Sequence, residues 1–202
     1  MQDQDDRKAG LAAIANEVEM LATSPLYAYR VAHGWRPVIG EGDHDASLML
    51  IGEAPGKEEA RQGRPFVGAS GRLLDELLAS VGLQRADVYI TNVVKDRPPD
   101  NRDPTVDEVR IYAPFLARQI DLIQPRVIAT LGRFAMQFVL AHFAMPEAGQ
   151  KISALHGRPL VAHATYGEVR VVPLYHPAVA LYAAKQKQTL LADFQQVRAQ
   201  LE

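Results

Sequence analysis

The stretch Ser47-Leu-Met-Leu-Ile-Gly-Glu-Ala-Pro-Gly56 decides the fold. Its apolar run is short, begins after a serine and ends at Gly52. A run of this length without a polar residue predicts a strand that is buried on both faces, as strands are in parallel sheets. The glycines and the proline that follow predict a tight loop at the carboxyl end of that strand.

Outward from this strand, patterns typical of strands and of helices alternate along the chain. Short apolar runs predict further strands over residues 87–93, 126–131 and 169–174. Helical periodicity and capping signals predict helices over residues 7–23, 73–81, 105 onward, 132–143 and about 186 onward. This order predicts an α/β fold: a three-layer α/β/α sandwich with a mostly parallel central sheet of about four strands.

Two local signals add detail to this outline. Thr105 and Glu108 form a capping-box pattern at a helix start, and Pro114 is expected to kink or divide the helix that follows. Residues 158–174, with Tyr166-Gly167 in the middle, are a candidate hairpin. Since no repeat, linker or low-complexity tract interrupts the chain, a single domain over residues 1–202 is expected.

Composition excludes several classes of protein. The 202 residues are 48% hydrophobic, and 22 Lys plus Arg against 24 Asp plus Glu give a net charge of −2, which argues neither for nor against a nucleic-acid partner. The absence of cysteine excludes disulfides, thiolate zinc sites, a cysteine nucleophile and a cysteine-ligated iron–sulfur cluster. The six histidines show no close pairing at ligand spacing, so no metal site is predicted. The acidic start resembles no signal peptide, no apolar run approaches about 18 residues, and a cytoplasmic protein is expected.

Candidate functional residues lie where ligands bind such sheets, in the loops at the carboxyl ends of the strands. The loop from Gly52 to Gly56 fits neither the dinucleotide-binding nor the Walker pattern, and a tight turn between strand and loop is sufficient to explain its glycines and proline. Glu53 and Glu59 are each either a base or a solvated carboxylate. Phe66, in a loop made stiff by Pro65, either fills the core or offers a platform for a planar ring.

Two polar side chains end predicted strands at this same edge. Asn92 either caps the adjacent loop or reads a ligand; its amide can face both the imino hydrogen and the 4-oxo group of uracil, whereas cytosine presents the reverse pattern. His176, just before Pro177, is either structural or part of the site. The convergence of Glu53, Asn92 and His176 on one edge favours the functional interpretation.

Several basic residues lie in loops or at a helix start beside apolar or aromatic neighbours such as Tyr182. They are either a solvated surface or a track for a phosphate backbone: Lys95, Arg97, Arg102, Arg158, Lys185 and Lys187.

Taken together, the motifs make the sequence similar to a known family. It resembles the iron–sulfur type of uracil-DNA glycosylase, called family 4, within the wider uracil-DNA glycosylase superfamily. The matching blocks run in family order between about residues 39 and 195: Gly52-Glu-Ala-Pro-Gly56, Gly63-Arg-Pro-Phe-Val-Gly68 with Ser70-Gly71, Tyr89-Ile-Thr-Asn-Val-Val-Lys95, Arg97-Pro-Pro99 with Asn101-Arg102, Leu131-Gly132 and His176-Pro177.

The chain departs from the family in one respect. Family members hold a four-cysteine cluster, but the family's Lys-Cys-Arg-Pro-Pro reads Lys95-Asp96-Arg97-Pro98-Pro99 here. The next family cysteine falls near Tyr112, and the N-terminal pair falls around Ser24 to Tyr27. The cluster is therefore expected to be absent, no metal or organic cofactor is expected, and what holds the loops at 24–45 and 95–112 is left open.

The resemblance implies excision of uracil from DNA by hydrolysis of its N-glycosidic bond, which initiates base excision repair. It implies that Phe66 stacks on the flipped uracil, that Asn92 reads its edge, and that His176 donates a hydrogen bond to O2. Glu53 is the first candidate for positioning water or balancing the cationic sugar, and Glu59 is the second. The aspartate of the best-known branch aligns with Ala54. The uracil-binding residues implied are Gly52, Ala54, Gly56, Phe66 and Asn92.

For DNA, the resemblance implies an intercalating loop over residues 178–182, in which Leu181 fills the gap left by the flipped base. The DNA-binding residues expected are Lys95, Arg97, Arg102, Pro177, Leu181, Tyr182 and Lys185. The partners expected are single- or double-stranded DNA that contains uracil, with free uracil as product, and the protein is expected to be a monomer.

Two other functions stay open on the sequence. One is a protein that captures uracil or abasic DNA with weak turnover, which the missing aspartate and cluster would suit. The other is a glycosylase for another deaminated base, such as hypoxanthine.

Overall fold

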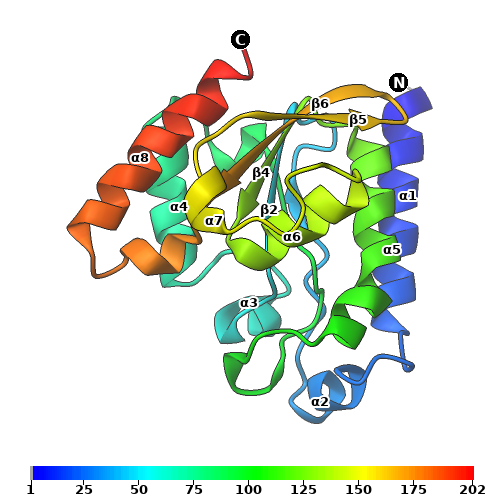
Figure 1. The fold of residues 1–202 in the computed structure, drawn as a ribbon. Coiled ribbons are helices and arrows are strands. Elements are labelled where there is room, and N and C mark those ends of the chain that lie inside the picture. Colours follow the sequence, from blue (N-terminus) through cyan, green and yellow to red (C-terminus); the bar gives the residue numbers. More distant parts are fainter. Residues whose placement is uncertain (1) are drawn as a thin grey trace.

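The core of the protein is one six-stranded sheet (Figure 1), seen in a computed structural model that describes residues 2–202. Its strands, in the spatial order β1-β3-β2-β4-β6-β5, are β1 (Glu41–Gly42), β3 (Tyr89–Asn92), β2 (Leu48–Gly52), β4 (Val127–Leu131), β6 (Gly167–Leu174) and β5 (Leu160–Ala164). The four inner strands are parallel, and the two edge strands are antiparallel to their neighbours. The predicted α/β class is confirmed.

The strand count is higher than the four expected. β5 and β6 form the candidate hairpin, which is confirmed. β1 is only two residues long and contains a glycine, so it carries no alternation that sequence reasoning could detect.

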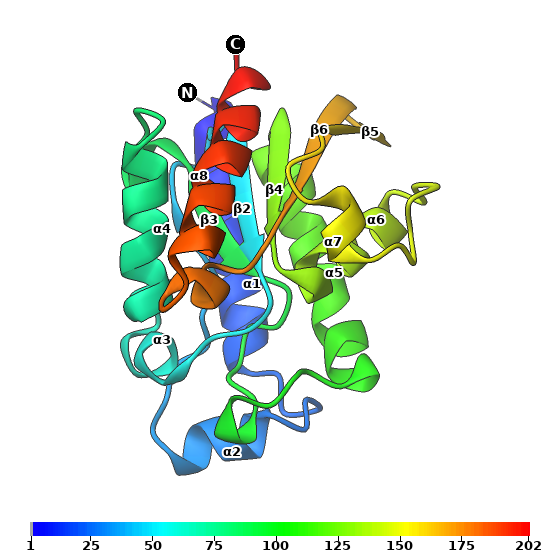
Figure 2. The same cartoon turned by 60° about the vertical axis from the view of Figure 1, so that its left-hand side comes forward.

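The two faces of the sheet bury alternate residues of each strand, as the pleat requires. Leu48 and Leu50 of β2 pack in the cluster under α4 (Ala69–Ala79) and α8 (Ala184–Ala199). Met49 and Ile51 pack in the opposite cluster, under α1 (Gln2–Glu19), α5 (Val106–Ile123) and α6 (Arg133–His142). Figure 2 shows these three layers edge-on.

Three further helices are too short for helical periodicity to reveal: α2 (Tyr27–Ala32), α3 (Lys57–Gln62) and α7 (Ile152–Leu155). Single 3₁₀ turns cover residues 85–87, 99–101 and 177–180. The first helix ends at Glu19, earlier than the predicted residue 23. None of the helices within residues 2–202 has both the length and the apolarity that crossing a bilayer requires.

Pro114 does not divide its helix, so that part of the prediction was wrong. α5 continues from Val106 to Ile123 with Pro114 in its interior, and Thr105 and Glu108 form the expected capping box. Pro114 lies on the exposed side of α5, where water can bond the carbonyl that loses its partner.

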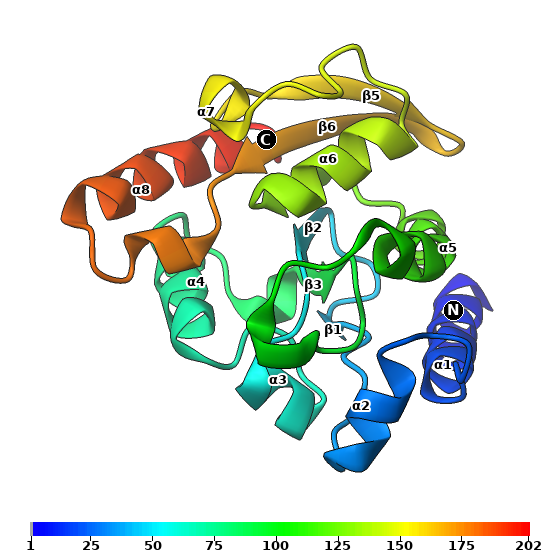
Figure 3. The same ribbon diagram turned by 60° about the horizontal axis from the view of Figure 1, so that its bottom comes forward.

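The carboxyl ends of the parallel strands meet at one edge of the sheet. Figure 3 looks towards this end of the molecule, where α3 and the loop with the 99–101 turn lie in front of the strands. The 177–180 turn follows β6 on the same side. The fold thus gathers the loops in which the sequence places functional residues.

Candidate active site

A pocket of about 370 Å³ opens at the carboxyl edge of the sheet. It brings together residues that sequence reasoning singled out in separate segments of the chain: Glu53, Ala54, Gly56, Glu59, Phe66, Asn92, Arg102 and His176. It also contains residues that lie in the segments quoted from the sequence but were given no individual role there: Pro55, Ser70, Pro98, Asn101 and Ala178.

The floor of the pocket depends on Gly52 having no side chain. A Cβ placed there would lie 2.3 Å from Asn92 Oδ1 and 2.7 Å from Phe66 Cζ. The amide and the aromatic ring therefore meet above this glycine, at the end of β2. Asn92 itself is 2% exposed, so its side chain serves the pocket rather than the solvent.

The loop that carries Phe66 is strained and is held from two sides. Phe66 has φ of +50°, which is costly for a bulky residue. Its carbonyl and that of Pro65 accept hydrogen bonds from Arg85, at 3.0 and 2.6 Å. On the other side, Glu59 Oε1 accepts from the backbone N–H groups of Val67 and Gly68, both at 2.9 Å. One oxygen of Glu59 is thus occupied in holding this loop, which fits a positioning role better than the role of a base.

His176 presents one defined tautomer to the pocket. Its Nδ1 accepts the backbone N–H of Ala178 at 3.1 Å, so the proton of the neutral ring is on Nε2. Burial lowers the pKa of His176 to about 4, against the opposing effect of Glu59, and the ring is therefore neutral at pH 7. The rings of Phe66 and His176 lie 5.8 Å apart between centroids. Gly132, with φ of +98°, leaves room for the histidine at the end of β4.

Glu53 follows β2 and lines the same pocket. Burial raises its pKa to about 7; the negative charge of Asp103 adds to the rise and Arg133 opposes it. Arg133 and Asp103 are themselves paired. A carboxyl group with this pKa can both hold and release a proton near neutral pH.

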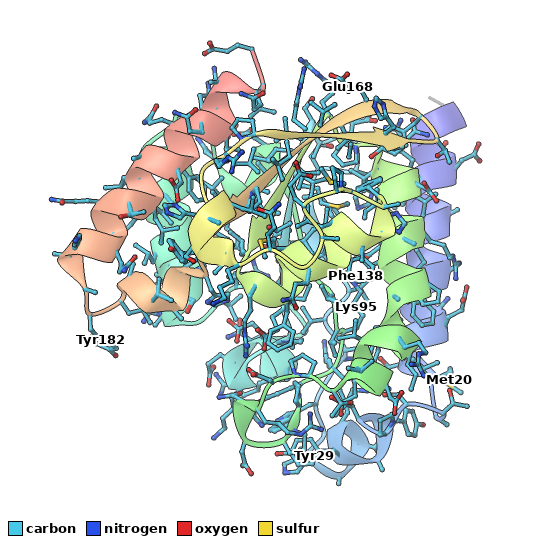
Figure 4. All side chains as sticks on the ribbon, viewed as in Figure 1. Met20, Tyr29, Lys95, Phe138, Glu168 and Tyr182 are labelled. Carbon is cyan, nitrogen blue, oxygen red and sulfur yellow. The ribbon has the colours of Figure 1, made fainter. Side chains whose placement is uncertain are left out.

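Lys95 cannot contact DNA in this structure, so its predicted role was wrong. The side chain is fully buried and its Nζ donates hydrogen bonds to oxygens inside the protein. Figure 4 shows it inside the molecule. The sequence places a cation in a loop, but the direction of the side chain is set by packing against α5.

Three other basic candidates form hydrogen bonds or ion pairs with side chains of the protein itself. Arg97 donates to Asn101 at 2.8 Å and lies over the ring of Trp35, 4.8 Å from its centroid. Arg102 forms a two-point ion pair with Glu108, at 2.8 and 2.6 Å, while it lines the pocket. Lys187 pairs with Glu76 at 2.6 Å.

The segment after His176 projects from the mouth of the pocket. Pro177 is buried in the 177–180 turn, and Leu181 is half-buried. Tyr182 is 98% exposed and points away from the molecule in Figure 4, and Lys185 is exposed at the start of α8. An exposed aromatic ring in the segment that follows Ala178, which lines the pocket, suits contact with a nucleic acid.

The positions at which the family resemblance places cysteines hold a buried polar network instead. Tyr112 OH donates to Asp96 Oδ2 at 2.7 Å and accepts from Ser24 Oγ at 2.8 Å. Asp96 Oδ1 lies 3.0 Å from Arg30 Nε, and Arg30 also donates to the carbonyl of Glu19 at 2.7 Å. These side chains offer no thiolate and bond to each other, so they do not fit an iron–sulfur cluster. They connect α1, α2, α5 and the loop after β3.

A larger hollow of about 570 Å³ lies between α5 and α6. Its lining, which includes Val109, Phe134 and Phe138, is apolar apart from Gln137 and His142. Because this lining offers a single ionisable side chain, the candidate active site is the smaller pocket, where two carboxyl groups, an amide and an imidazole converge.

Asn101 belongs to one of the matching family blocks, but the sequence analysis gave it no role in the site. It lines the pocket in the left-handed conformation, with φ of +53°, directly after Asp100 at φ of +54°. Two consecutive left-handed residues that are not glycine are unusual and cluster at functional sites. The available signal was a polar residue in a proline-rich loop at the carboxyl edge of the sheet.

Comparison with known proteins agrees with the geometry. The family model described as Uracil DNA glycosylase superfamily matches residues 39–201. The type-4 uracil-DNA glycosylase of Archaeoglobus fulgidus is 45% identical over 160 residues, 79% of this chain and 79% of that protein. That of Sulfurisphaera tokodaii is 42% identical over 189 residues, 93% of this chain and 83% of that protein. A type-5 uracil-DNA glycosylase of Thermus thermophilus is 39% identical over 137 residues, 60% and 62% of the two chains. The chain belongs to the uracil-DNA glycosylase superfamily.

Proposed function

We propose that this protein is a uracil-DNA glycosylase, which hydrolyses the bond between uracil and deoxyribose in DNA and leaves an abasic site. The observation that carries the proposal is the single pocket in which Phe66, Asn92 and His176 converge. The names of the type-4 relatives support the same activity.

Recognition of the base rests on Asn92 and Phe66. The base lies against the Phe66 ring, and the amide of Asn92 donates to the 4-oxo group and accepts from the imino hydrogen of uracil. Cytosine would place its 4-amino group, a donor, against the donating side of the Asn92 amide, and buried polar groups would be left unpaired. Unpaired buried polar groups discriminate strongly between bases of the same size. The strained loop at Phe66 is held in place before the base arrives, so the platform is preorganised.

Bond cleavage rests on His176. As the N-glycosidic bond breaks, the pyrimidine ring gains negative charge, and the Nε2–H of the neutral imidazole donates to O2. A preorganised donor of this kind contributes about 3 to 4 kcal/mol to stabilising the transition state. Since Nδ1 already accepts the N–H of Ala178, the ring needs no reorientation during the reaction.

Glu53 acts on the sugar side of the bond. Its carboxylate orients the attacking water and balances the positive charge that develops on the deoxyribose. With a pKa of about 7, it is present in both protonation states at neutral pH.

DNA approaches the pocket mouth between Arg102 and the segment of Leu181, Tyr182 and Lys185. Leu181 fills the gap left by the flipped base. We further propose that the protein acts as a monomer and that its activity is in the cytoplasm. Pro177 orders the turn rather than contacting DNA by itself.

The direct test uses synthetic DNA with one uracil, single- and double-stranded, followed by alkaline cleavage of abasic sites. We expect cleavage at uracil in at least one form of the substrate, and none when cytosine or thymine replaces it. Tight binding without cleavage under single-turnover conditions would overturn the proposal in favour of a binding protein. Cleavage at hypoxanthine but not at uracil would identify a different glycosylase.

A further inference from the structure

Lys95 is a buried amine surrounded by oxygen atoms of uncharged groups. Its Nζ lies 2.8 Å from Thr91 Oγ1 and 2.6 Å from the backbone carbonyl of Asn92, and it also donates to Gln119 Oε1. The side chain has no exposed surface, and burial lowers the pKa of its ammonium group well below the ordinary value. A lysine is costly in such a place, so its contacts call for an explanation.

The orientation of these partners shows which of them depend on Lys95. Thr91 Oγ1 donates its own hydrogen to the carbonyl of Ile39 at 2.6 Å. Gln119 Nε2 donates to the same carbonyl at 2.9 Å and to Tyr89 OH at 3.1 Å, which turns its Oε1 towards Lys95. All three oxygens around Nζ therefore act as acceptors.

The carbonyl of Asn92 needs this donor because of its place in the sheet. The N–H of Val93 donates to the carbonyl of Gly52 on β2. Because the main-chain groups of successive strand residues point to opposite sides, the N–H and carbonyl of Asn92 face the other neighbour, β1. β1 pairs with Tyr89 and Ile90, and this pairing does not extend as far along β3 as Asn92. Lys95 Nζ thus takes the position that a strand partner would occupy at the end of β3.

We propose that Lys95 is a positioning residue for base recognition: by bonding the main-chain carbonyl of Asn92, it fixes the amide that reads uracil. The proposal rests on the proposed function of the pocket. The amide sits in the narrow space above Gly52, where a Cβ would lie 2.3 Å from Asn92 Oδ1 and 2.7 Å from Phe66 Cζ. Recognition of a base in such a space depends on the exact position of the amide, because a misplacement of about 1 Å can be costly for the reaction.

The test compares Lys95→Met with a matched control, Gln119→Met. Both variants remove one member of the same buried network and replace it with an unbranched apolar chain. Only Lys95→Met releases the carbonyl of Asn92, because in Gln119→Met the bond between Lys95 and Asn92 can persist. The stability of both is measured by thermal unfolding, so that activities are compared at a temperature where both are folded.

For Lys95→Met we expect a loss of at least tenfold in single-turnover excision of uracil and a similar weakening of inhibition by free uracil. Affinity for undamaged DNA should stay within about twofold, since the phosphate backbone does not contact this site. Gln119→Met should keep excision and uracil inhibition within about threefold of the parent. A purely structural lysine would affect both variants alike, in proportion to their loss of stability.

Parent-like excision and uracil inhibition in a folded Lys95→Met protein would overturn the proposal, as would equal losses in the two variants. If Lys95→Met does not fold, Lys95→Leu replaces it, since it also removes the donor to the carbonyl of Asn92 and is a more compact apolar side chain. Parent-like inhibition by free uracil in that variant would then refute the role. The parent protein is assayed first, so failure of the parent to excise uracil is seen as failure of the proposed function alone.

Discussion

At the scale of single residues, the protonation state of His176 determines what it can contribute. A charged imidazole would attract an anion more strongly, but burial holds the pKa near 4 and keeps the ring neutral. The contribution must then come from geometry, with Nε2–H fixed towards the pocket by the bond at Nδ1. A donor aimed in advance at the site of growing charge costs no reorganisation during the reaction.

Replacement of His176 by alanine should therefore affect the rate more than binding. We expect His176→Ala to lower single-turnover cleavage by about 10²- to 10³-fold, the range for one such donor. Binding of uracil DNA should weaken far less, because the interaction is strongest where charge has developed. Rate, affinity and melting temperature are measured on the same preparation. A variant that melts early yet cleaves at nearly the parent rate would assign His176 to the core.

Glu53 should give the reaction a pH dependence near neutrality. If its carboxylate is the active form, the single-turnover rate should rise with pH through about 7, the pKa that burial produces. Glu53→Gln should lower the rate and remove this rise. If the rate of Glu53→Gln still rose with pH at the same midpoint as that of the parent, the titrating group would be a different one.

The same shift has an opposite effect on stability. The folded protein binds a proton at Glu53 more tightly than the unfolded chain, whose glutamate has its ordinary pKa of 4.5. The stability from this group is complete below that value and is lost as the pH rises towards 7. Denaturant unfolding of the parent and of Glu53→Gln between pH 4.5 and 8 measures this effect. The free energy of unfolding of the parent should fall relative to that of the variant as the pH rises from 4.5 to about 7.

At the scale of elements, the network around Tyr112 connects segments that are distant in the sequence. We expect Tyr112→Phe to lower the free energy of unfolding by about 1 to 3 kcal/mol, because the buried carboxylate of Asp96 loses a donor and Ser24 loses its acceptor. Tyr182→Phe is the control, since Tyr182 is 98% exposed and should change stability very little. Equal unfolding curves for Tyr112→Phe and the parent would mean that the network does not hold these segments.

The elements also show how far sequence reasoning could reach. The strand at Leu48 to Ile51 was predictable because burial on both faces demands an unbroken apolar run. Its parallel neighbours then placed Asn92 and His176 at one edge, which the structure bears out in the shared pocket. Two-residue β1 and six-residue α3 leave no periodic signal, so the support they give to the site was not predictable.

Side-chain direction was the other limit. Sequence position alone assigns Lys95 to a polar loop, although its amine turns inward towards Gln119 on α5, which is 24 residues away. Likewise, Glu59 is a plausible base until its bonds to Val67 and Gly68 are seen. Both residues depend on contacts between segments that pattern and spacing cannot reveal.

At the scale of the whole molecule, the protein should fold and act without iron. The chain has no cysteine, and the side chains at the corresponding positions are bonded to each other. The wall of the pocket formed by Asn101 and Arg102 belongs to the same loop as Asp96. That loop is attached to α2 through Arg30 and to α5 through Tyr112, so the connection that shapes the pocket wall needs no metal.

We therefore expect the purified protein to be colourless, to contain no stoichiometric iron and to unfold in one cooperative transition. Elemental analysis, an absorbance scan and thermal unfolding are to be made on the same sample that is assayed for uracil excision. Stoichiometric iron with visible charge-transfer bands would contradict the expectation directly. An iron-free sample that is folded but becomes active only when iron is supplied would show that the Asp96–Tyr112 network cannot by itself hold the pocket wall. If the iron-free, folded parent is active and Tyr112→Phe is less stable than the parent, hydrogen bonds and one buried ion pair are sufficient to hold the pocket wall.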